Sequence, residues 1–300
     1  MLGVTLNENL SRVSELGIYV AMSLYAAAFV TLALQLSRSA STKKADRQSA
    51  DRLEKVGIWL MIVAALAHGF GVVGRGIAAS RVPWANMYEF TITGTFVVVV
   101  IFLVAQLLRD VRFLGTFVSG FVTLALGIAT TFFYVQVKTL MPALQSYWLV
   151  IHVTVAILAT AFFNIATGLA IAYLFKSGTK IQARFKSLKR ALEKFPDLDR
   201  LEQLSYRFNI VGFILWSFTL IAGAIWAERA WHRYWGWDTK EVWTFIIWTI
   251  YAGYLHANAT RGWSGKRSAW LSLVGFLAIM FNFTIVNLFF KGLHVYSGLK

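Results

Sequence analysis

Histidine and tryptophan are the residues of this sequence whose types and spacing could carry chemistry. The stretch "WHRYWGWDTKEVW", residues 231–243, holds four tryptophans and a tyrosine among charged residues. The chain also has five histidines, and imidazole is a common metal ligand. A histidine inside an apolar, membrane-like segment is expensive and by default suggests a functional site. The five are His68, His152, His232, His256 and His294.

Six of the twelve tryptophans fall within residues 226–248. Tryptophan favours membrane interfaces, so a simple aromatic belt is one interpretation. Belt residues are usually spread over many helix ends, whereas these gather at one connection, among Asp238, Lys240 and Glu241. The competing interpretation is a platform for a large, flat, apolar ligand, because aromatic rings offer broad contact area with a defined stacking geometry.

Two histidines that approach such a platform from different helices suggest haem as the flat ligand. Haem has aromatic faces, an iron with two axial positions and two propionates. It therefore needs stacking surfaces, imidazole ligands and cationic partners for its carboxylates. Arg229, Arg233 and Lys240 are candidates for that last role, although a basic residue near an interface often only reaches toward lipid headgroups.

The composition places these residues in a membrane. Hydrophobic residues make up 58% of the 300 positions and charged residues 14%, which is too apolar for an ordinary soluble domain. The formal charge of +15 would suit nucleic acid, but basic residues in such a chain usually report topology, and no nucleic-acid partner is expected. Since the chain has no cysteine, any thiol chemistry must come from a partner.

The apolar runs predict an all-α, polytopic membrane bundle of about eight transmembrane helices, because each is long enough to cross about 30 Å of hydrocarbon. The runs lie at 16–37, 56–76, 88–108, 113–135, 147–175, 208–227, 240–260 and 268–290. Assigning the loops alternately to the two sides puts 20 of the 29 Lys and Arg on one face. That face is predicted to be cytoplasmic. Both termini and the Trp-rich loop are therefore expected on the extracytoplasmic side.

The segment 176–207 has an amphipathic pattern on the predicted cytoplasmic side. Its apolar residues recur at spacings of four, three, four and three, with basic residues between them. This pattern predicts an amphipathic helix that lies on anionic headgroups. The apolar residues are Ile181, Phe185, Leu188, Leu192 and Phe195.

Five motifs, in order along the chain, closely resemble those of the CcsA (also ResC) family of cytochrome c biogenesis proteins, which belong to a wider group of haem-handling proteins with a tryptophan-rich WWD domain. The motifs are "PWANMYEF", "IHV", "WHRYWGWDTKEVW", "LHANATRGW" and "GLHVYSG". The resemblance spans residues 56 to 296 or so. It leaves residues 1–55 as an amino-terminal helix and cytoplasmic loop outside it. By this resemblance, residues 56–300 would form the haem-handling core, with the external WWD loop at 226–248 and the cytoplasmic segment at 176–207.

The resemblance implies one membrane subunit of a cytochrome c synthase, or haem lyase, that works with a second membrane protein, CcsB (ResB). Haem b would be presented on the Trp-rich domain at the outer face, with His152 and His294 as axial ligands of its iron. His256 matches the family's histidine within the membrane, which holds haem on its way out. An incoming apocytochrome c would offer a Cys-x-x-Cys-His segment, whose two thiols add to the haem vinyl groups.

The membrane implied is the bacterial cytoplasmic (inner) membrane or the thylakoid membrane. Whether the chain alone is an enzyme stays open. The residues expected to bind haem are His152, His294, His256, Trp231, Trp235, Trp237, Asp238, Trp243, Arg233 and Lys240.

His68 and His232 could also have roles other than binding iron. His256 is expected about 8 Å above the inner end of its helix and His68 about 18 Å above the inner end of its own. Because this difference in depth makes them poor co-ligands, the partner of His256 is expected from the CcsB-like subunit. His68 is equally well a structural histidine. His232 and Thr239 stand where the family motif usually has Gly and Pro. His232 either competes as an iron ligand or faces water, and Thr239 is expected to cap the seventh helix.

Two other functions are compatible with parts of this pattern. A b-haem protein that transfers electrons across the membrane would also need paired histidines and aromatic packing. A transporter could use the aromatic loop to gate an amphipathic solute. Neither explains the ordered set of five motifs.

Overall fold

The computed structural model describes the whole chain except residues 1, 138–143, 185, 261, 291 and 294–300, so the predicted ligand His294 lies outside the described residues. The described part is helical and contains no strand, which confirms the predicted all-α fold. The long helices are α1 (Leu2–Ser39), α2 (Lys44–Ala79), α3 (Met87–Leu108), α4 (Gly115–Phe132), α5 (Tyr147–Ser177), α8 (Leu198–Trp231), α9 (Thr239–Thr260) and α10 (Lys266–Phe281). The short ones are η1 (Arg112–Leu114), α6 (Thr179–Arg184), α7 (Lys186–Glu193), the π-helical η3 (Asn282–Val286) and α11 (Asn287–Phe289).

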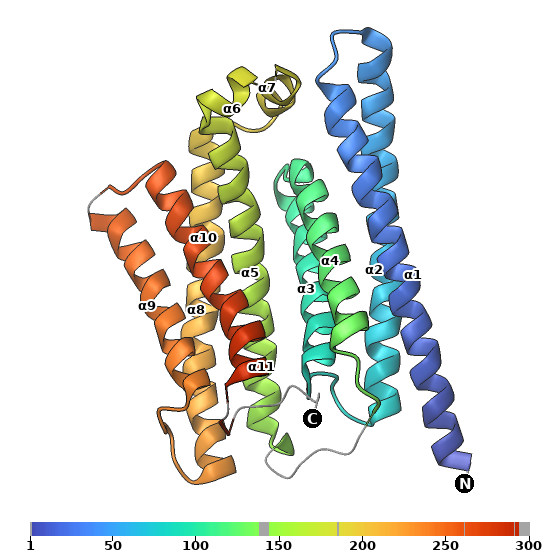
Figure 1. The fold of residues 1–300 in the computed structure, drawn as a ribbon, viewed down its shortest axis with the longest axis vertical. Helices are drawn as coiled ribbons and strands as arrows, with labels where there is room; N and C mark the ends of the chain where they lie inside the picture. Colours follow the sequence, from blue (N-terminus) through green and yellow to red (C-terminus); the bar gives the residue numbers. More distant parts are fainter. Residues whose placement is uncertain (1, 138–143, 185, 261, 291, 294–300) are drawn as a thin grey trace.

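Seven of the described helices are long and apolar enough to cross a membrane, and the chain is an integral membrane protein. The eighth long helix, α9, runs beside them in the bundle (Figure 1). Its 22 residues suit a span, but Lys240 and Glu241 near its start and several Trp and Tyr residues lower its hydropathy. The predicted number of about eight long helices is therefore confirmed, with α9 as the polar member.

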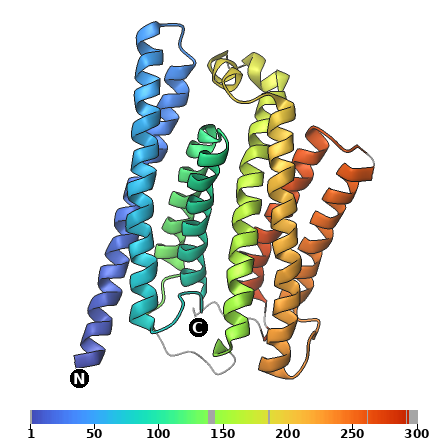
Figure 2. The ribbon, with the colours of Figure 1, turned by 180° about the vertical axis from the view of Figure 1, so that it is seen from behind.

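The helices form two neighbouring groups (Figure 1, Figure 2). One group holds α1 to α4 and the other holds α5 and α8 to α11, with α3 against α5. The α1–α2 hairpin extends beyond the other helices at one end, because α2 begins at Lys44 rather than at residue 56 as predicted. At the other end of the bundle, α1 begins, α11 ends and the Trp-rich loop joins α8 to α9 (Figure 1).

Small residues let α1 and α2 pack closely along their length. A Cβ built on Gly71 would lie 2.7 Å from Cδ1 of Ile18, which is closer than atoms can pack. Ser14 on α1 donates to the carbonyl of the same glycine at 2.6 Å. Close backbone approach through small residues is the usual way in which helices associate in lipid.

Where a single amphipathic helix was predicted in the segment 176–207, the described residues form α6 and α7, on either side of residue 185, which lies outside the described residues. The helical part ends at Glu193, before α8 begins at Leu198. Pro196 explains one interruption, because a proline disfavours the helical conformation of the residue before it, here Phe195. Leu192 is buried, and Phe195 packs against the core. Phe185 of the predicted apolar stripe lies outside the described residues.

A buried cluster of charges joins the end of α2 to the start of α3. Nε of Arg75 lies 3.1 Å from Oε1 of Glu89, and Nη1 of Arg81 lies 2.6 Å from Oε2. Asn86 caps α3 by accepting the N–H of Glu89 at 2.9 Å. The guanidinium of Arg75 also lies over the ring of Tyr88, 5.3 Å from its centroid. Two cations thus compensate one buried carboxylate, which fixes the chain between the two helices.

Candidate functional site

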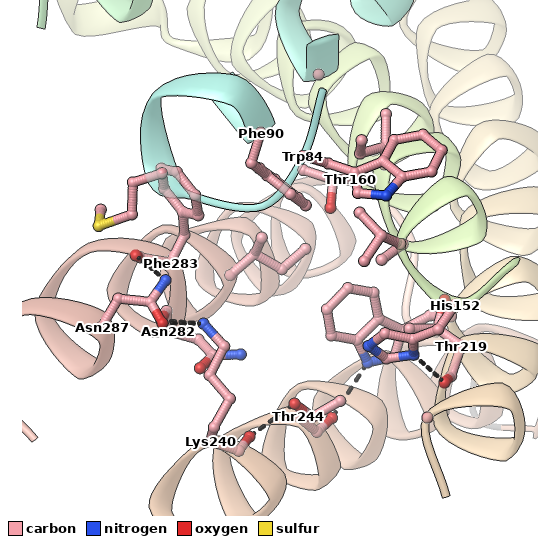
Figure 3. A pocket seen from close by; sticks show the side chains of 18 of the residues that line it. Trp84, Phe90, His152, Thr160, Thr219, Lys240, Thr244, Asn282, Phe283 and Asn287 are labelled. Carbon is pink, nitrogen blue, oxygen red and sulfur yellow. Dashed lines mark hydrogen bonds between the residues drawn. The ribbon is translucent and has the colours of Figure 1, made fainter. Parts of the chain in front are cut away.

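A cavity of about 280 Å³ lies at the Trp-rich end of the bundle, among α3, α5, α8, α9 and η3 (Figure 3). Small-molecule sites are usually concave, mostly apolar pockets of about 300–1,000 Å³, and this cavity is just below that range. Its walls include the aromatic rings of Trp84, Phe90, Trp216, Trp226 and Phe283.

His152, in the second turn of α5, points into this cavity (Figure 3). Its Nδ1 lies 2.9 Å from the carbonyl oxygen of Thr219 on α8. Because a carbonyl can only accept, Nδ1 carries the proton of this bond. The ring also stacks on Trp226, with centroids 5.9 Å apart and planes 20° apart. Histidines that ligate metals are usually oriented by such a bond from their other nitrogen, so this geometry suits an iron ligand.

The amino terminus of α9 fixes the Trp-rich loop. The carboxylate of Asp238 accepts the N–H of Lys240 at 2.8 Å, and that of Glu241 accepts the N–H groups of Gly236 and Asp238 at 2.8 and 3.1 Å. This reciprocal arrangement is a capping box. The N-cap of α9 is therefore Asp238 rather than the predicted Thr239, and the carboxylate of Glu241 holds the loop backbone.

His232 ends α8 at the other side of the loop. It adopts the left-handed conformation with φ 57° and ψ 35°, and its N–H donates to the carbonyl of Glu228 at 2.7 Å. Its side chain is exposed, and it is not among the residues that line the cavity. Of the two interpretations of His232, its exposed position outside the cavity lining favours a side chain that faces water over an iron ligand.

The four tryptophans of the loop region have different surroundings. Trp235 lines the cavity, and Trp237 stands edge-on to it with centroids 5.9 Å apart. Trp231 packs edge-on against Trp226 at 4.8 Å, and Trp243 packs against a phenylalanine of α10 at 4.4 Å. Trp237 is 76% exposed and has a φ of 58°, a region that bulky residues avoid. Two tryptophans thus anchor the loop, while two offer ring surface at or beside the cavity.

Lys240 reaches from α9 to the π-helical turn that follows α10 (Figure 3). Its Nζ donates to the carbonyl of Asn282 at 3.1 Å and to Oδ1 of Asn287 at 2.8 Å. Within the described residues, Oδ1 of Asn282 and Oε1 of Glu241 are buried without a hydrogen-bond partner. Both residues line the cavity. Unpaired buried polar atoms are rare in proteins, and a π-helical turn often marks a functional site, so a ligand or water is expected on this wall.

The two arginines near the loop make local contacts. Nη1 of Arg233 donates to the carbonyl of Gly236 at 3.3 Å. The guanidinium of Arg229 lies 5.4 Å from the ring centroid of Tyr147. Neither arginine lines the cavity. Both stand at its periphery, near the start of α5 and within the loop.

The other described histidines lie away from the cavity. His68 is fully buried, with Nδ1 3.4 Å from the hydroxyl of Tyr25 and its ring edge-on to Phe96 at 5.5 Å. His256 is exposed on α9, which lies in the other helix group from α2 (Figure 1). The two histidines therefore do not face each other, and among the described histidines His152 is the one that lines the same cavity as Trp235 and Lys240.

Sequence reasoning missed the residues that shape the cavity from α8 and η3. Thr219 binds His152 through its backbone carbonyl, and Gly223 leaves room for the ring because it has no side chain. Neither role can be predicted from the type of side chain at that position. Asn282 and Asn287 do have one, because amides are unusual in a run as apolar as "IMFNFTIVNLFF". The spacing of apolar residues alone gave no reason to place them opposite Lys240.

The fold and this site define an integral membrane protein with an aromatic, histidine-bearing cavity at one end of its helix bundle. The chain belongs to the cytochrome C assembly protein family, whose family model matches residues 84–294. It is 33% identical over 289 residues to the cytochrome c biogenesis protein CcsA of Synechococcus elongatus. This alignment covers 82% of this chain and 88% of that protein. It is 33% identical over 241 residues to CcsA of Guillardia theta, covering 75% and 80% of the two chains. The resemblance that the motifs indicated is thereby confirmed.

A solved structure with a similar fold is that of the cytochrome c heme lyase CcmF. The two chains superpose with a TM-score of 0.64 at 14% identity, over 91% of this chain. The match spans 46% of the CcmF chain, less than half of its length. At this identity the likeness concerns the fold alone.

Proposed function

We propose that this protein is the haem-handling subunit of a cytochrome c synthase. It exports haem b and presents it at the outer membrane face, for thioether attachment to the Cys-x-x-Cys-His segment of apocytochrome c. Membership of the cytochrome C assembly family and similarity to CcsA proteins support a part in cytochrome c maturation. The observation that carries the haem-binding part is His152, oriented by Thr219 within an aromatic cavity.

The cavity fits one part of a haem. Aromatic walls suit the flat macrocycle, and imidazole suits its iron. A volume of about 280 Å³ takes only part of the ring. The remainder lies against the outer surface of the Trp-rich loop, where Tyr234 and Trp237 are 64% and 76% exposed. Their rings offer flat apolar contact area next to the cavity.

His152 and His294 are the two axial ligands of this external haem. Nδ1 of His152 donates to Thr219, so the ring would bind iron through Nε2. His294 directly follows Leu293, whose N–H donates to the carboxylate of Asp238 at 2.7 Å. Leu293, the residue before His294 in the sequence, therefore contacts the Trp-rich loop.

The other residues of the loop region have three roles in this proposal: stacking on haem, packing of the loop and binding of the propionates. Trp235 and Trp237 supply stacking surface, while Trp231 and Trp243 hold the loop by packing. Arg233 and Lys240 attract the propionates by charge-assisted hydrogen bonds. An ammonium has three donors, and Lys240 uses two of them on Asn282 and Asn287 within the described residues.

The chemistry resides in haem and in the substrate. Each thiol adds across a vinyl group, so that a C–S bond forms and the thiol proton goes to the other vinyl carbon. The protein supplies position, which is where most of the rate gain of such an addition would arise. The two histidines fix the face and depth of the haem, and the aromatic walls exclude water from its edge.

His256 belongs to a second haem site within the membrane, shared with a CcsB/ResB-like subunit. An exposed imidazole on a membrane helix is expensive unless a partner covers it, and His256 is exposed in the isolated chain. The subunit would therefore pack against α9 and supply the co-ligand. By the positive-inside rule the Trp-rich end faces away from the cytoplasm, in a bacterial inner membrane or a thylakoid membrane.

Purification with and without the co-expressed CcsB-like partner tests this function. Pyridine-haemochrome and reduced-minus-oxidised spectra are recorded for the wild type, His152→Ala, His294→Ala and His256→Ala. Either outer variant is expected to lose or shift the external haem, and His256→Ala to lose a second haem only when the partner is present. His232→Asn is the matched control, since asparagine tolerates the left-handed conformation, and its spectrum is expected to stay that of the wild type.

Three results would contradict the proposal. The first is a wild type without haem even when its partner is present. The second is normal cytochrome maturation by both outer variants without added imidazole. The third is reversible redox cycling with a quinone and no haem transfer, which would favour an electron-transfer protein instead.

A further inference from the structure

One wall of the cavity presents two hydrogen-bond acceptors without a donor. Oε1 of Glu241 and Oδ1 of Asn282 are buried and have no hydrogen-bond partner in the described part of the chain. Glu241 is 7% exposed and Asn282 is 4% exposed, and both residues line the cavity. Because a buried acceptor without a partner costs free energy, and a charged one costs most, we expect a bound molecule to supply the missing donor.

The carboxylate of Glu241 is held in place by its other oxygen. Oε2 accepts the N–H groups of Gly236 and Asp238 at 2.8 and 3.1 Å, so Oε1 cannot turn toward the loop backbone without breaking those bonds. An ionised carboxylate offers only acceptors, whereas the amide of Asn282 can turn to present either its oxygen or its N–H groups. The group that meets Oε1 must therefore bring the proton of the hydrogen bond.

Lys240 provides a donor beside these acceptors (Figure 3). Its Nζ donates to the carbonyl of Asn282 at 3.1 Å and to Oδ1 of Asn287 at 2.8 Å, which accounts for two of its three donors within the described residues. A group that accepts from Lys240 and donates to Glu241 would complete both side chains. A carboxylic acid has this combination in its C=O and O–H, while a carboxylate or an ester lacks the O–H.

The charges at this wall are already balanced. The titratable side chains come from α5, the Trp-rich loop and the start of α9. His152, Tyr234, Lys240 and Glu241 line the cavity, and Arg233 and Asp238 lie beside it in the loop. The described lining residues from α3, α4, α8, α10 and η3 are not titratable. Two cations thus balance two carboxylates, and a further carboxyl group that shares the site with Glu241 is expected to keep its proton.

We propose that Glu241 binds one propionic side chain of haem in its protonated form, with the O–H donating to Oε1 and the C=O accepting from Lys240. Each bound haem then takes up one proton from solvent. The amide of Asn282 offers its N–H to the same carboxyl group. The inference rests on the proposed haem-binding function and makes Glu241 a specificity-determining residue, because Oε1 accepts a carboxylic acid and disfavours a carboxylate.

Iron-free protoporphyrin IX tests this proton without any iron ligation. Its affinity for the full chain in lipid nanodiscs is measured from pH 6 to pH 8 by quenching of tryptophan fluorescence, with protein-free nanodiscs as the reference. Uptake of one proton is expected to weaken binding to the wild type about tenfold per pH unit. Protoporphyrin IX dimethyl ester, which has no carboxyl group, is expected to bind equally at every pH.

Glu241→Gln is the decisive variant, because glutamine also serves in a capping box and would present an N–H to a carboxylate. Its affinity for protoporphyrin IX is expected to be nearly independent of pH and about tenfold higher than that of the wild type at pH 8. Glu228→Gln is the matched control. Glu228 lies in the last turn of α8, at the same end of the bundle, and does not line the cavity, so the wild-type pH dependence is expected to remain.

Amide exchange at Gly236 and Asp238 shows whether Glu241→Gln keeps the loop in place. If it does not, Asn282→Leu is the second variant. This change is expected to weaken the binding of protoporphyrin IX at pH 6 about fivefold, the equivalent of one hydrogen bond, and to leave the dimethyl ester unaffected. Equal weakening of both porphyrins would contradict the proposal.

Equal pH dependence in the wild type and Glu241→Gln would overturn the proposal, because another group such as His152 would then take up the proton. A profile flattened as much by Glu228→Gln would overturn it as well, since the effect would then belong to the general charge of this end of the bundle. Haem binding by the wild type separates the two levels of failure. If haem binds, only the protonated carboxyl is wrong, whereas a wild type that binds neither haem nor protoporphyrin IX refutes the proposed function too.

Discussion

His152 and Gly223 face each other across α5 and α8, so closely that a Cβ on residue 223 would lie 2.8 Å from both Nδ1 and Cε1 of the imidazole. The ring keeps its place because residue 223 has no side chain. One turn earlier on the same face of α8, the carbonyl of Thr219 accepts the Nδ1 proton at 2.9 Å. Helix α8 thus sets the position of His152 through a backbone carbonyl, a missing side chain and the ring of Trp226.

Gly223→Ala is therefore expected to displace the ring of His152 and to weaken haem binding about five- to tenfold, the equivalent of one lost hydrogen bond. Stability is expected to change by less than about 1 kcal/mol, since alanine is the better helix former. Haem absorbance per protein at a fixed haem concentration measures the effect. Gly253→Ala serves as the control, because its Cβ meets nothing within 4 Å. Unchanged haem content in Gly223→Ala would show that the ring tolerates the methyl group.

Glu89→Ala is expected to destabilise the fold, because it leaves Arg75 and Arg81 without the carboxylate that compensates them. Removing one partner of a buried ion pair costs about 3–5 kcal/mol, and chemical unfolding of the purified protein in detergent measures the loss. The matched control is Asp110→Ala. Its ion pair with Arg112 is largely exposed, so its loss is expected to cost less than about 1 kcal/mol. Equal losses in the two variants would mean that the cluster does not behave as a buried one.

The sequence was sufficient for the helices, because each apolar run of the required length has to satisfy its backbone internally in a bilayer. It was less informative where a helix leaves the hydrocarbon. The stretch "KADRQSADRLEK" that opens α2 is mostly charged and polar, so hydropathy started this helix at residue 56, whereas the backbone starts at Lys44. At the far end of the chain, neither hydropathy nor helical spacing reveals the π-helical turn at η3.

The candidate site was predictable to the extent that it depends on side-chain identity. His152, Trp235 and Lys240 were all predicted, and all three line one cavity. The contacts that orient them involve a backbone carbonyl at Thr219 and a missing side chain at Gly223. Such features exist only once α5 and α8 are packed. The same holds for Asp238, whose carboxylate both caps α9 and accepts the N–H of Leu293.

His68→Leu is expected to leave haem content unchanged, because His68 is enclosed by Tyr25 and Phe96, with its Nε2 buried and unpaired within the described residues. The weak contact of 3.4 Å with Tyr25 is lost, while an apolar side chain of similar size keeps the packing. The free energy of unfolding is expected to change by less than about 1.5 kcal/mol. Haem content and unfolding in detergent are measured together. A fall in haem content to half or less would return His68 to the list of ligands.

Trp237 and Trp243 are expected to separate haem binding from stability. Trp243→Ala removes the packing of a partly buried ring against α10 and is expected to cost about 3 kcal/mol, the low end for replacing a tryptophan by alanine in a core. Trp237→Ala removes a ring that is 76% exposed, so unfolding is expected to shift by no more than about 0.5 kcal/mol while haem retention falls. Unfolding in detergent and haem loss to an apoprotein acceptor measure the two effects. If Trp237→Ala retains haem as the wild type does, the exposed ring has no part in the platform, and its left-handed backbone needs another explanation.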